Sequence, residues 1–263
     1  IRLMTTKALR DIFGTEIVKI GAKNKKIIAI SPDLKQATKL SYFFEKYPDR
    51  SIETGIAEAN AVGIAAGLAM SGFRPIISSF GSFLTGKNIE IRTSIAFNNA
   101  PVVLVGTHGG LIGPDGPTQA GLQDISVMRS IPNIKVVQPS TEIETKKILQ
   151  KYLSKKSKDI VYIRISREKT KEFFKENFKF KEGDINLIIN SCKDALVLTS
   201  GPMLGKCYDA IKKIKKYKIG LGNLSSIKPI DLKILKKLSK KTKKIITVED
   251  HNVMGGLGSA INE

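Results

Sequence analysis

Short apolar segments alternate with longer segments of helical periodicity along most of the chain. The apolar segments are rich in β-branched residues and end in small or polar ones, which is typical of buried strands. The strands expected from this pattern are 26–33, 74–80, 100–109, 134–140 and 159–166. The helices expected between them are 5–22, 57–72, 121–131 and 140–156. Strands that alternate with helices in this way predict an α/β fold, with a parallel sheet between two helical layers.

A polar, charged stretch interrupts this pattern and predicts a linker at 169–184. After it the alternation restarts, with strands expected at 194–201, 217–226 and 243–250. We therefore expect two parallel-sheet, three-layer α/β domains, residues 1–168 and residues 185–263. Because the chain ends where another helix is due to begin, the second domain is expected to be incomplete.

The formal net charge of +20 invites a nucleic-acid-binding interpretation. Residues 1–145 carry 16 Lys and Arg against 12 Asp and Glu, whereas residues 146–263 carry 28 against 12. Much of the excess is lysine in amphipathic helical stretches such as 210–218 and 232–244. Trp is absent and aromatic residues make up 6% of the chain, so a base-stacking surface is not expected. A solvated, lysine-rich face explains the charge, and a nucleic-acid-binding module is the distant alternative.

The cysteine content and the hydropathy narrow the class of protein further. Cys192 and Cys207 are the only cysteines, too few for a disulfide framework or a thiolate metal site, which fits a reducing cytoplasm. No run of about 18 apolar residues is present, so a transmembrane helix is not expected. The first residues lack the pattern of a signal peptide.

One carboxylate, Glu58, lies in the most apolar of the expected helices. Taken alone it is an ordinary first-turn acid, which the helix dipole favours by about 0.3–1 kcal/mol. Ligand sites of parallel α/β sheets collect at the carboxyl ends of the strands. The loops expected there are 31–37, 79–86, 107–119, 165–170 and 249–256, most of them glycine-containing and polar. We therefore expect the functional site where these loops meet.

The order of these segments carries a family resemblance. The stretch TGIAEANAVGIAAGLAMSG is followed by RPIISSFGSFLTG, THGGLIGPDGPTQ, VYIRISR and ITVEDHNVMGGLGSA. With this order and spacing, essentially the whole chain resembles the C-terminal half of transketolase and of 1-deoxyxylulose-5-phosphate synthase. The likeness is greatest to the small subunit of split, two-chain transketolases. The resemblance implies a thiamine-diphosphate pyrimidine-binding domain at 1–168, followed by a transketolase C-terminal-like domain.

The resemblance also implies cofactor-binding residues. Glu58 stands where the family carries a catalytic glutamate that faces N1′ of the cofactor's aminopyrimidine ring. Since a carboxyl removed from water holds a proton more readily than a solvated one, Glu58 is expected to share a proton with the ring and so activate the cofactor. Phe80 and Phe83 match the aromatic residues around that ring, although core packing would also explain them. Asp33 resembles a family aspartate close to the thiazolium.

Substrate-binding residues are implied in the same way. His108 matches the histidine that meets the sugar phosphate, and Asp115 matches the aspartate that meets a substrate hydroxyl. Arg167 matches the arginine that grips the phosphate, for which a planar guanidinium is well suited. Lys7 stands near the place of a second phosphate-binding arginine.

Two positions depart from the family pattern. Gln119 replaces a usual histidine; it is expected to hydrogen-bond the substrate, but unlike imidazole it does not titrate near neutral pH. Gly109 stands where aspartate is common. These departures affect the identity of the donor and acceptor sugars more than they affect the class of reaction.

A missing motif implies a partner. The family holds the diphosphate and Mg²⁺ through a GDG…N motif in its other half, and this chain has no such motif and no metal site of its own. The resemblance therefore implies a partner subunit that carries the GDG motif, with thiamine diphosphate bound between the chains. A heterotetramer of two plus two chains is the family expectation.

The expected activity is the transfer of a two-carbon ketol unit between phosphorylated sugars. The enzyme alternatives are a 1-deoxyxylulose-5-phosphate synthase-like subunit and a β subunit of a 2-oxo acid dehydrogenase. A non-catalytic paralogue that acts as a structural partner is the alternative from another class, and the presence of Glu58, Phe80 and Phe83 argues against it.

Overall fold

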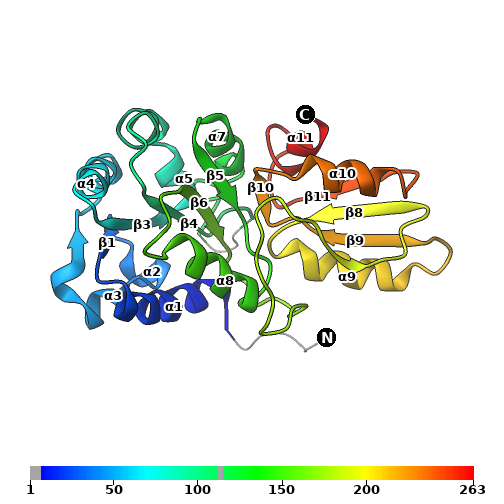
Figure 1. Ribbon diagram of the computed structural model, residues 1–263, viewed down its shortest axis with the longest axis horizontal. Coiled ribbons are helices and arrows are strands. Elements are labelled where there is room, and N and C mark those ends of the chain that lie inside the picture. Colours follow the sequence, from blue (N-terminus) through cyan, green and yellow to red (C-terminus); the bar gives the residue numbers. More distant parts are fainter. Residues whose placement is uncertain (1–6, 112–114) are drawn as a thin grey trace.

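Two sheets of mainly parallel strands organise the chain, as the computed structural model shows for residues 7–111 and 115–263 (Figure 1). The larger sheet has the order β10-β5-β6-β4-β3-β1-β2, and the smaller one has the order β11-β8-β9-β7. Helices lie on both faces of each sheet (Figure 1). The expected α/β class, with two three-layer units, is confirmed. None of the helices within the described ranges is long and apolar enough to cross a membrane.

The larger sheet is formed mostly by the first part of the chain. Its strands there are β1 (Ile27–Ser31), β2 (Ser51–Glu53), β3 (Arg74–Phe80), β4 (Val103–Thr107), β5 (Ile134–Val137) and β6 (Ile160–Ile165). All of these pair in parallel, and β1, β3, β4 and β6 are buried along their whole length. Near-continuous runs of apolar, β-branched residues suit strands that are covered on both faces.

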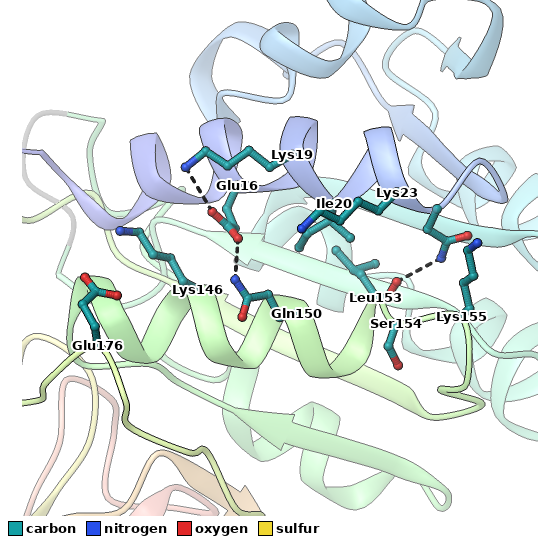
Figure 2. A pocket seen from close by; sticks show the side chains of 11 residues that line it. Glu16, Lys19, Ile20, Lys23, Lys146, Gln150, Leu153, Ser154, Lys155 and Glu176 are labelled. Atoms are coloured by element: carbon teal, nitrogen blue, oxygen red, sulfur yellow. Dashed lines mark hydrogen bonds and ion pairs between the residues drawn. The ribbon is translucent and has the colours of Figure 1, made fainter.

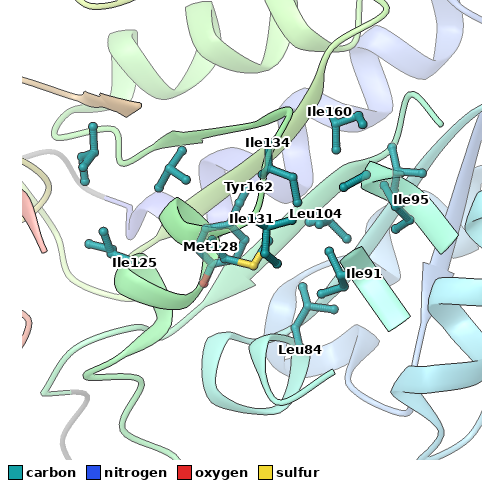
Figure 3. Close-up of a cluster of buried hydrophobic side chains, with 14 of the residues drawn as sticks. Leu84, Ile91, Ile95, Leu104, Ile125, Met128, Ile131, Ile134, Ile160 and Tyr162 are labelled. Atoms are coloured by element: carbon teal, nitrogen blue, oxygen red, sulfur yellow. The ribbon is translucent and has the colours of Figure 1, made fainter. Parts of the chain in front are cut away.

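Two helical layers cover this sheet. One layer contains α1 (Leu9–Lys23), α2 (Lys35–Thr38), α3 (Ser41–Lys46) and α8 (Glu142–Tyr152), with a 3-10 turn at Pro48–Arg50. The other contains α4 (Glu58–Met70), α5 (Gly81–Thr85), α6 (Asn88–Glu90), a π-helical turn (Ile91–Ala96) and α7 (Asp124–Ser130). Figure 3 shows the apolar core under the second layer, where Met128 and Ile91 approach Leu104 and Tyr162 of the sheet.

The smaller sheet is formed by the last third of the chain. Its strands are β7 (Asn186–Ile189), β8 (Ala195–Thr199), β9 (Ile219–Asn223) and β11 (Ile245–Val248). Its helices are α9 (Met203–Lys213), α10 (Leu232–Ser239) and α11 (Leu257–Asn262). The strands β8, β9 and β11 pair in parallel, whereas β7 is antiparallel to β9.

One strand from the second part of the chain belongs to the first sheet. β10 (Ser226–Lys228) pairs antiparallel with β5, and the backbone N–H of Gln138 donates to Ser225 O at 2.7 Å. The apolar core under α7 also continues into the second unit through Leu224 and Ile227. The two sheets are therefore joined by backbone pairing and by a shared core.

A buried carboxylate, Glu144, reinforces this joint. Glu144 lies in the first turn of α8, where its backbone N–H donates to the Thr141 hydroxyl, a capping arrangement. Its carboxylate accepts from Ser140 N at 2.7 Å and from Asn223 Nδ2, at the end of β9, at 2.9 Å. Complete burial raises the pKa of Glu144 to about 7, against the smaller, opposing influence of these hydrogen bonds.

We expect Glu144 to make stability depend on pH. Because its pKa is raised on folding, the folded state binds more protons than the unfolded state between about pH 4.5 and 7, so stability is lost as pH rises through this window. The shift corresponds to about 3 kcal/mol in the free energy of unfolding. Urea unfolding of the native chain and Glu144→Gln at several pH values measures this. The difference in stability between the two proteins should change with pH; a constant difference would contradict the prediction.

Candidate active site

Glu58 is the first residue of α4 and is only 8% exposed. The preceding Ala57 cannot cap the helix through its side chain. The Glu58 carboxylate lies in the first turn, at the positive end of the helix dipole. The Ser79 hydroxyl, near the end of β3, donates to Glu58 Oε1 at 3.3 Å. The carboxylate is thus fixed where α4 meets the carboxyl edge of the sheet.

Two phenylalanines lie at and just after the end of β3, the strand whose Ser79 contacts Glu58. Phe80 ends β3 and Phe83 lies in α5, and their rings stack with centroids 5.5 Å apart and 25° between their planes. The Phe80 ring also meets the ring of His108, just beyond β4, edge to face at 4.7 Å. Neighbouring strands β3 and β4 therefore bring Phe80, Phe83 and His108 together, as expected for the carboxyl edge of a parallel sheet.

His108 is almost completely buried and is held neutral. Burial, helped by the positive charges of Arg167 and Arg10 and opposed by the negative charge of Asp115, lowers its pKa to about 4. Arg10 Nη1 lies 3.1 Å from His108 Nε2. Since a guanidinium can only donate, Nε2 accepts and the ring proton is on Nδ1. That N–H is buried and has no hydrogen-bond partner within the described residues.

Arg10 is a site residue that the sequence reasoning missed. It lies in the first turn of α1, whose start is tied to the end of β6 by hydrogen bonds to the backbone oxygens of Ser166 and Glu168. Its Nη1 also donates to Ala37 O, whereas its Nε is buried without a partner in the part of the chain that is described. Its position beside the apolar residues Leu9 and Ile12, at the start of an expected helix, was the available signal.

Three further predicted site residues, Asp115, Gln119 and Arg167, lie next to this group. Asp115 and Arg167 form an ion pair, and both charges act on His108. The backbone oxygen of Gln119 accepts from the Ser82 hydroxyl at 3.1 Å, next to Phe83, and its side-chain oxygen accepts from the hydroxyl of the adjacent Thr118. The structure therefore gathers these three predicted residues around the carboxyl edge of the sheet.

Asp33 and Lys7 come from two other segments, the turn after β1 and the residues before α1. Asp33 is exposed in the turn after β1, in the left-handed region with φ 60°, and its N–H donates to Glu53 Oε1 at 2.7 Å. Lys7 is the first described residue and is exposed. The roles of Asp33 and Lys7 stay predictions.

A buried ion pair lies next to the site, between β6 and the start of α7. Asp124, the first residue of α7, accepts from Arg164 Nε at 2.8 Å and from the Tyr162 hydroxyl at 2.7 Å. Arg164 also donates to Gly121 O at 2.8 Å. A Cβ on Gly109 would come within 2.3 Å of Arg164 Nε. A side chain at position 109 would therefore collide with the Arg164 guanidinium, which suits the glycine found there.

A cavity of about 760 Å³ lies elsewhere, between α1 and α8. Figure 2 shows its polar lining, in which Glu16 contacts Lys19 and Gln150. None of its lining residues is a predicted site residue. Among the described residues, no group of three or more His, Cys, Asp and Glu side chains is placed to hold a metal ion.

The fold and this geometry define a class of protein: an α/β chain with a buried acid, an aromatic pair and a cationic group at the carboxyl edge of its larger sheet. Residues 5–172 match the family described as the transketolase pyrimidine binding domain, and residues 186–263 match the transketolase C-terminal domain. The chain belongs to the transketolase family and corresponds to its C-terminal section.

Individual relatives agree with this membership. The chain is 32% identical to a Methanocaldococcus jannaschii protein provisionally named a transketolase C-terminal section, covering 98% of this chain and 81% of that one. It is 36% identical to rat transketolase, covering 97% of this chain and 41% of the relative. A structure described as a split-gene transketolase, inactive beta4 tetramer, superposes with a TM-score of 0.87 at 32% identity, covering 98% of this chain and 84% of that one. The chain spans about two fifths of the transketolases and 1-deoxy-D-xylulose-5-phosphate synthases that it matches.

Proposed function

We propose that this chain is the C-terminal-section subunit of a thiamine-diphosphate-dependent transketolase, which transfers a two-carbon ketol unit between phosphorylated sugars. The observation that carries the proposal is the buried carboxyl of Glu58 beside the stacked rings of Phe80 and Phe83. An acid in this position suits proton exchange with a ring nitrogen, because little water competes for its hydrogen bond.

The residues present fit the pyrimidine half of the cofactor. Phe80 and Phe83 offer ring surface for stacking, and Glu58 Oε2, which accepts no hydrogen bond from the described residues, offers a position for a proton at the ring nitrogen. The Ser79 hydroxyl keeps Glu58 Oε1 oriented. When bound, the cofactor supplies the carbon nucleophile and the electron sink of the reaction. Asp33 is proposed to approach the other ring of the cofactor.

The cationic group fits a phosphorylated sugar. His108 Nδ1–H and Arg10 Nε are buried donors without partners in the described chain, and buried donors of this kind favour an acceptor from a ligand. Arg167 adds a second guanidinium, and Lys7 a further cation nearby in the chain. We propose that these groups bind the phosphate, while Asp115 and Gln119 contact sugar hydroxyls.

A partner subunit completes the site in this proposal. It carries the GDG motif and holds the diphosphate and Mg²⁺, for which this chain has no counterpart. The exposed side of α4 supports such an interface: Cβ atoms at Gly63 and Gly67 would meet only open space, and Met70 is 62% exposed. Phe97, which follows the neighbouring π-helical turn, is 84% exposed. Small residues beside exposed apolar ones suit close packing against another chain.

A 1-deoxyxylulose-5-phosphate synthase-like activity is the second candidate. It is favoured by relatives of that name, which are 32–33% identical over 95–96% of this chain. Both reactions use the cofactor and a phosphorylated sugar, but the synthase consumes pyruvate. Gln119 does not decide between the two activities, since the resemblance places a histidine there in both enzymes.

Reconstitution of the complex tests the function. The chain is mixed with a GDG-bearing subunit, thiamine diphosphate and Mg²⁺, and assayed with xylulose 5-phosphate and ribose 5-phosphate. We expect ketol transfer by the mixture and none by either chain alone. Phe97→Asp serves as a control that should weaken assembly without touching Glu58. Release of CO₂ from pyruvate without ketol transfer would favour the synthase, and cofactor binding with neither reaction would contradict both activities.

A further inference from the structure

The segment that follows β11 lies against both described ends of the candidate substrate loop. This segment, residues 249–252, comes from the second sheet, and we call it the latch segment. The candidate substrate loop follows β4 and leads into α7, and its described parts are 108–111 and 115–123. Backbone hydrogen bonds join the two ends of the loop, with Gly110 N donating to Gly121 O at 3.1 Å. The two ends of the loop therefore lie side by side, and the latch segment contacts both of them.

Asp250 holds the entering end. Its Oδ1 accepts from the backbone N–H of Leu111 at 3.0 Å. The preceding Gly110 has φ 94°, and a Cβ there would come within 2.0 Å of Asp250 Oδ2. Asp250 therefore lies directly against the backbone at this end of the loop, which requires glycine for two reasons, its dihedral angle and the close approach of the carboxylate.

Asn252 holds the leaving end. Its backbone N–H and its Nδ2 both donate to Leu122 O, at 3.1 and 2.6 Å. Its Oδ1 accepts from Met254 N at 2.7 Å, so both ends of its amide group are used. The side chain is thereby fixed between the second domain and the loop.

The latch segment is itself anchored. Glu249 accepts from the backbone N–H groups of Leu257 and Gly258, in the first turn of α11, at 2.6 and 3.0 Å. The His251 side chain is fully buried, with its Nε2 4.0 Å from Oδ1 of Asp124, the residue that begins α7. Because the segment is fixed at both sides, its contacts hold the loop to the second domain.

We propose that Asp250 and Asn252 are positioning residues, through which the C-terminal domain sets the place of the substrate loop that carries His108, Asp115 and Gln119. This inference rests on the proposed function for the identity of the substrate. It gives the second domain a part in substrate binding although the domain supplies no group to the candidate active site. The effect is on the recognition of the phosphorylated sugar and not on the pyrimidine pocket around Glu58.

Paired substitutions test this proposal in the reconstituted complex. Asp250→Ala removes the acceptor for Leu111 N, whereas Asp250→Asn keeps an oxygen that can accept the same hydrogen bond. We expect Asp250→Ala to raise KM for xylulose 5-phosphate about tenfold, with the dissociation constant of thiamine diphosphate unchanged, and Asp250→Asn to stay within about twofold of the native complex. Equal KM values for the two variants, or weaker cofactor binding in Asp250→Ala, would overturn the proposal.

A second measurement separates this proposal from the proposed function. Hydrogen exchange of the Leu111 amide in the chain itself needs no substrate. Exchange should be faster in Asp250→Ala than in the native chain and near native in Asp250→Asn. Unchanged exchange in Asp250→Ala would refute the latch, even if ketol transfer is found. If the native complex transfers no ketol unit, the proposed function fails, and the exchange result still decides whether Asp250 holds the loop.

Discussion

Replacing Glu58 by glutamine is expected to reduce ketol transfer by at least about 100-fold, the range found when a general acid–base group is removed. Gln keeps the size of the side chain and an oxygen that can accept from the Ser79 hydroxyl, 3.3 Å from Glu58 Oε1 in the native chain. It cannot exchange a proton near neutral pH. The loss should therefore appear in kcat, measured in the reconstituted complex with saturating cofactor.

The controls for this variant separate chemistry from folding. Glu58→Gln should unfold at nearly the native urea concentration, because the amide occupies the same buried place at the start of α4. Ser79→Ala removes only the hydroxyl that orients the carboxyl, so its activity should fall by less than that of Glu58→Gln. Activity of Glu58→Gln close to native would rule out proton exchange at this carboxyl.

The fold class was predictable because burial on both faces of a sheet leaves a strong pattern in the sequence. The five strands expected before the linker all form, as β1, β3, β4, β5 and β6. The short strand β2 was missed, and its residues are only partly buried or exposed, so apolar periodicity does not mark it. The short helices α5 and α6 were also missed, because helices of this length lack a full apolar face.

The candidate site was predictable mainly from the resemblance, which assigns Glu58, Phe80 and Phe83 to the cofactor pocket; taken alone, Glu58 is an ordinary first-turn acid. An isolated acid in an apolar helix and two phenylalanines after a strand are visible in the sequence. Arg10 was missed because its contact with His108 is 98 positions away in the chain and depends on how α1 begins beside β6. Lys7 was the cation chosen instead, from the resemblance, because it stands near the place of a second phosphate-binding arginine.

Contacts between the two sheets were beyond the sequence reasoning for the same reason. Nothing in Ser226–Lys228 distinguishes a strand of the second sheet from one that pairs with β5. The loop 249–256 was recognised as a candidate, but its contacts with Leu111 and Leu122 follow from the docking of the two sheets. Long-range placement of this kind is decided by packing, which local patterns do not record.

Breaking the buried pair Arg164–Asp124 should cause the largest loss in the free energy of unfolding. Both side chains are at most 1% exposed, and the guanidinium Nε lies 2.8 Å from Asp124 Oδ2. Arg164→Met leaves the Asp124 carboxylate buried, with the Tyr162 hydroxyl as its one remaining hydrogen-bond donor among the described residues, and it leaves Gly121 O without the guanidinium. Removing one partner of a buried ion pair costs about 3–5 kcal/mol, so we expect a loss of this size in urea unfolding.

The second substitution shows whether the uncompensated charge causes that loss. Asp124→Asn in the Arg164→Met background removes the charge and keeps an acceptor for the Tyr162 hydroxyl, so the double variant should be more stable than Arg164→Met alone. Lys206→Met is the matched control, because its partner Glu168 and Lys206 itself are 39% and 55% exposed, and it should cost at most about 1 kcal/mol. If Arg164→Met cost no more than this control, the pair would not support the substrate loop. A large loss would instead show that Gly109, Gly121 and the start of α7 depend on one buried guanidinium.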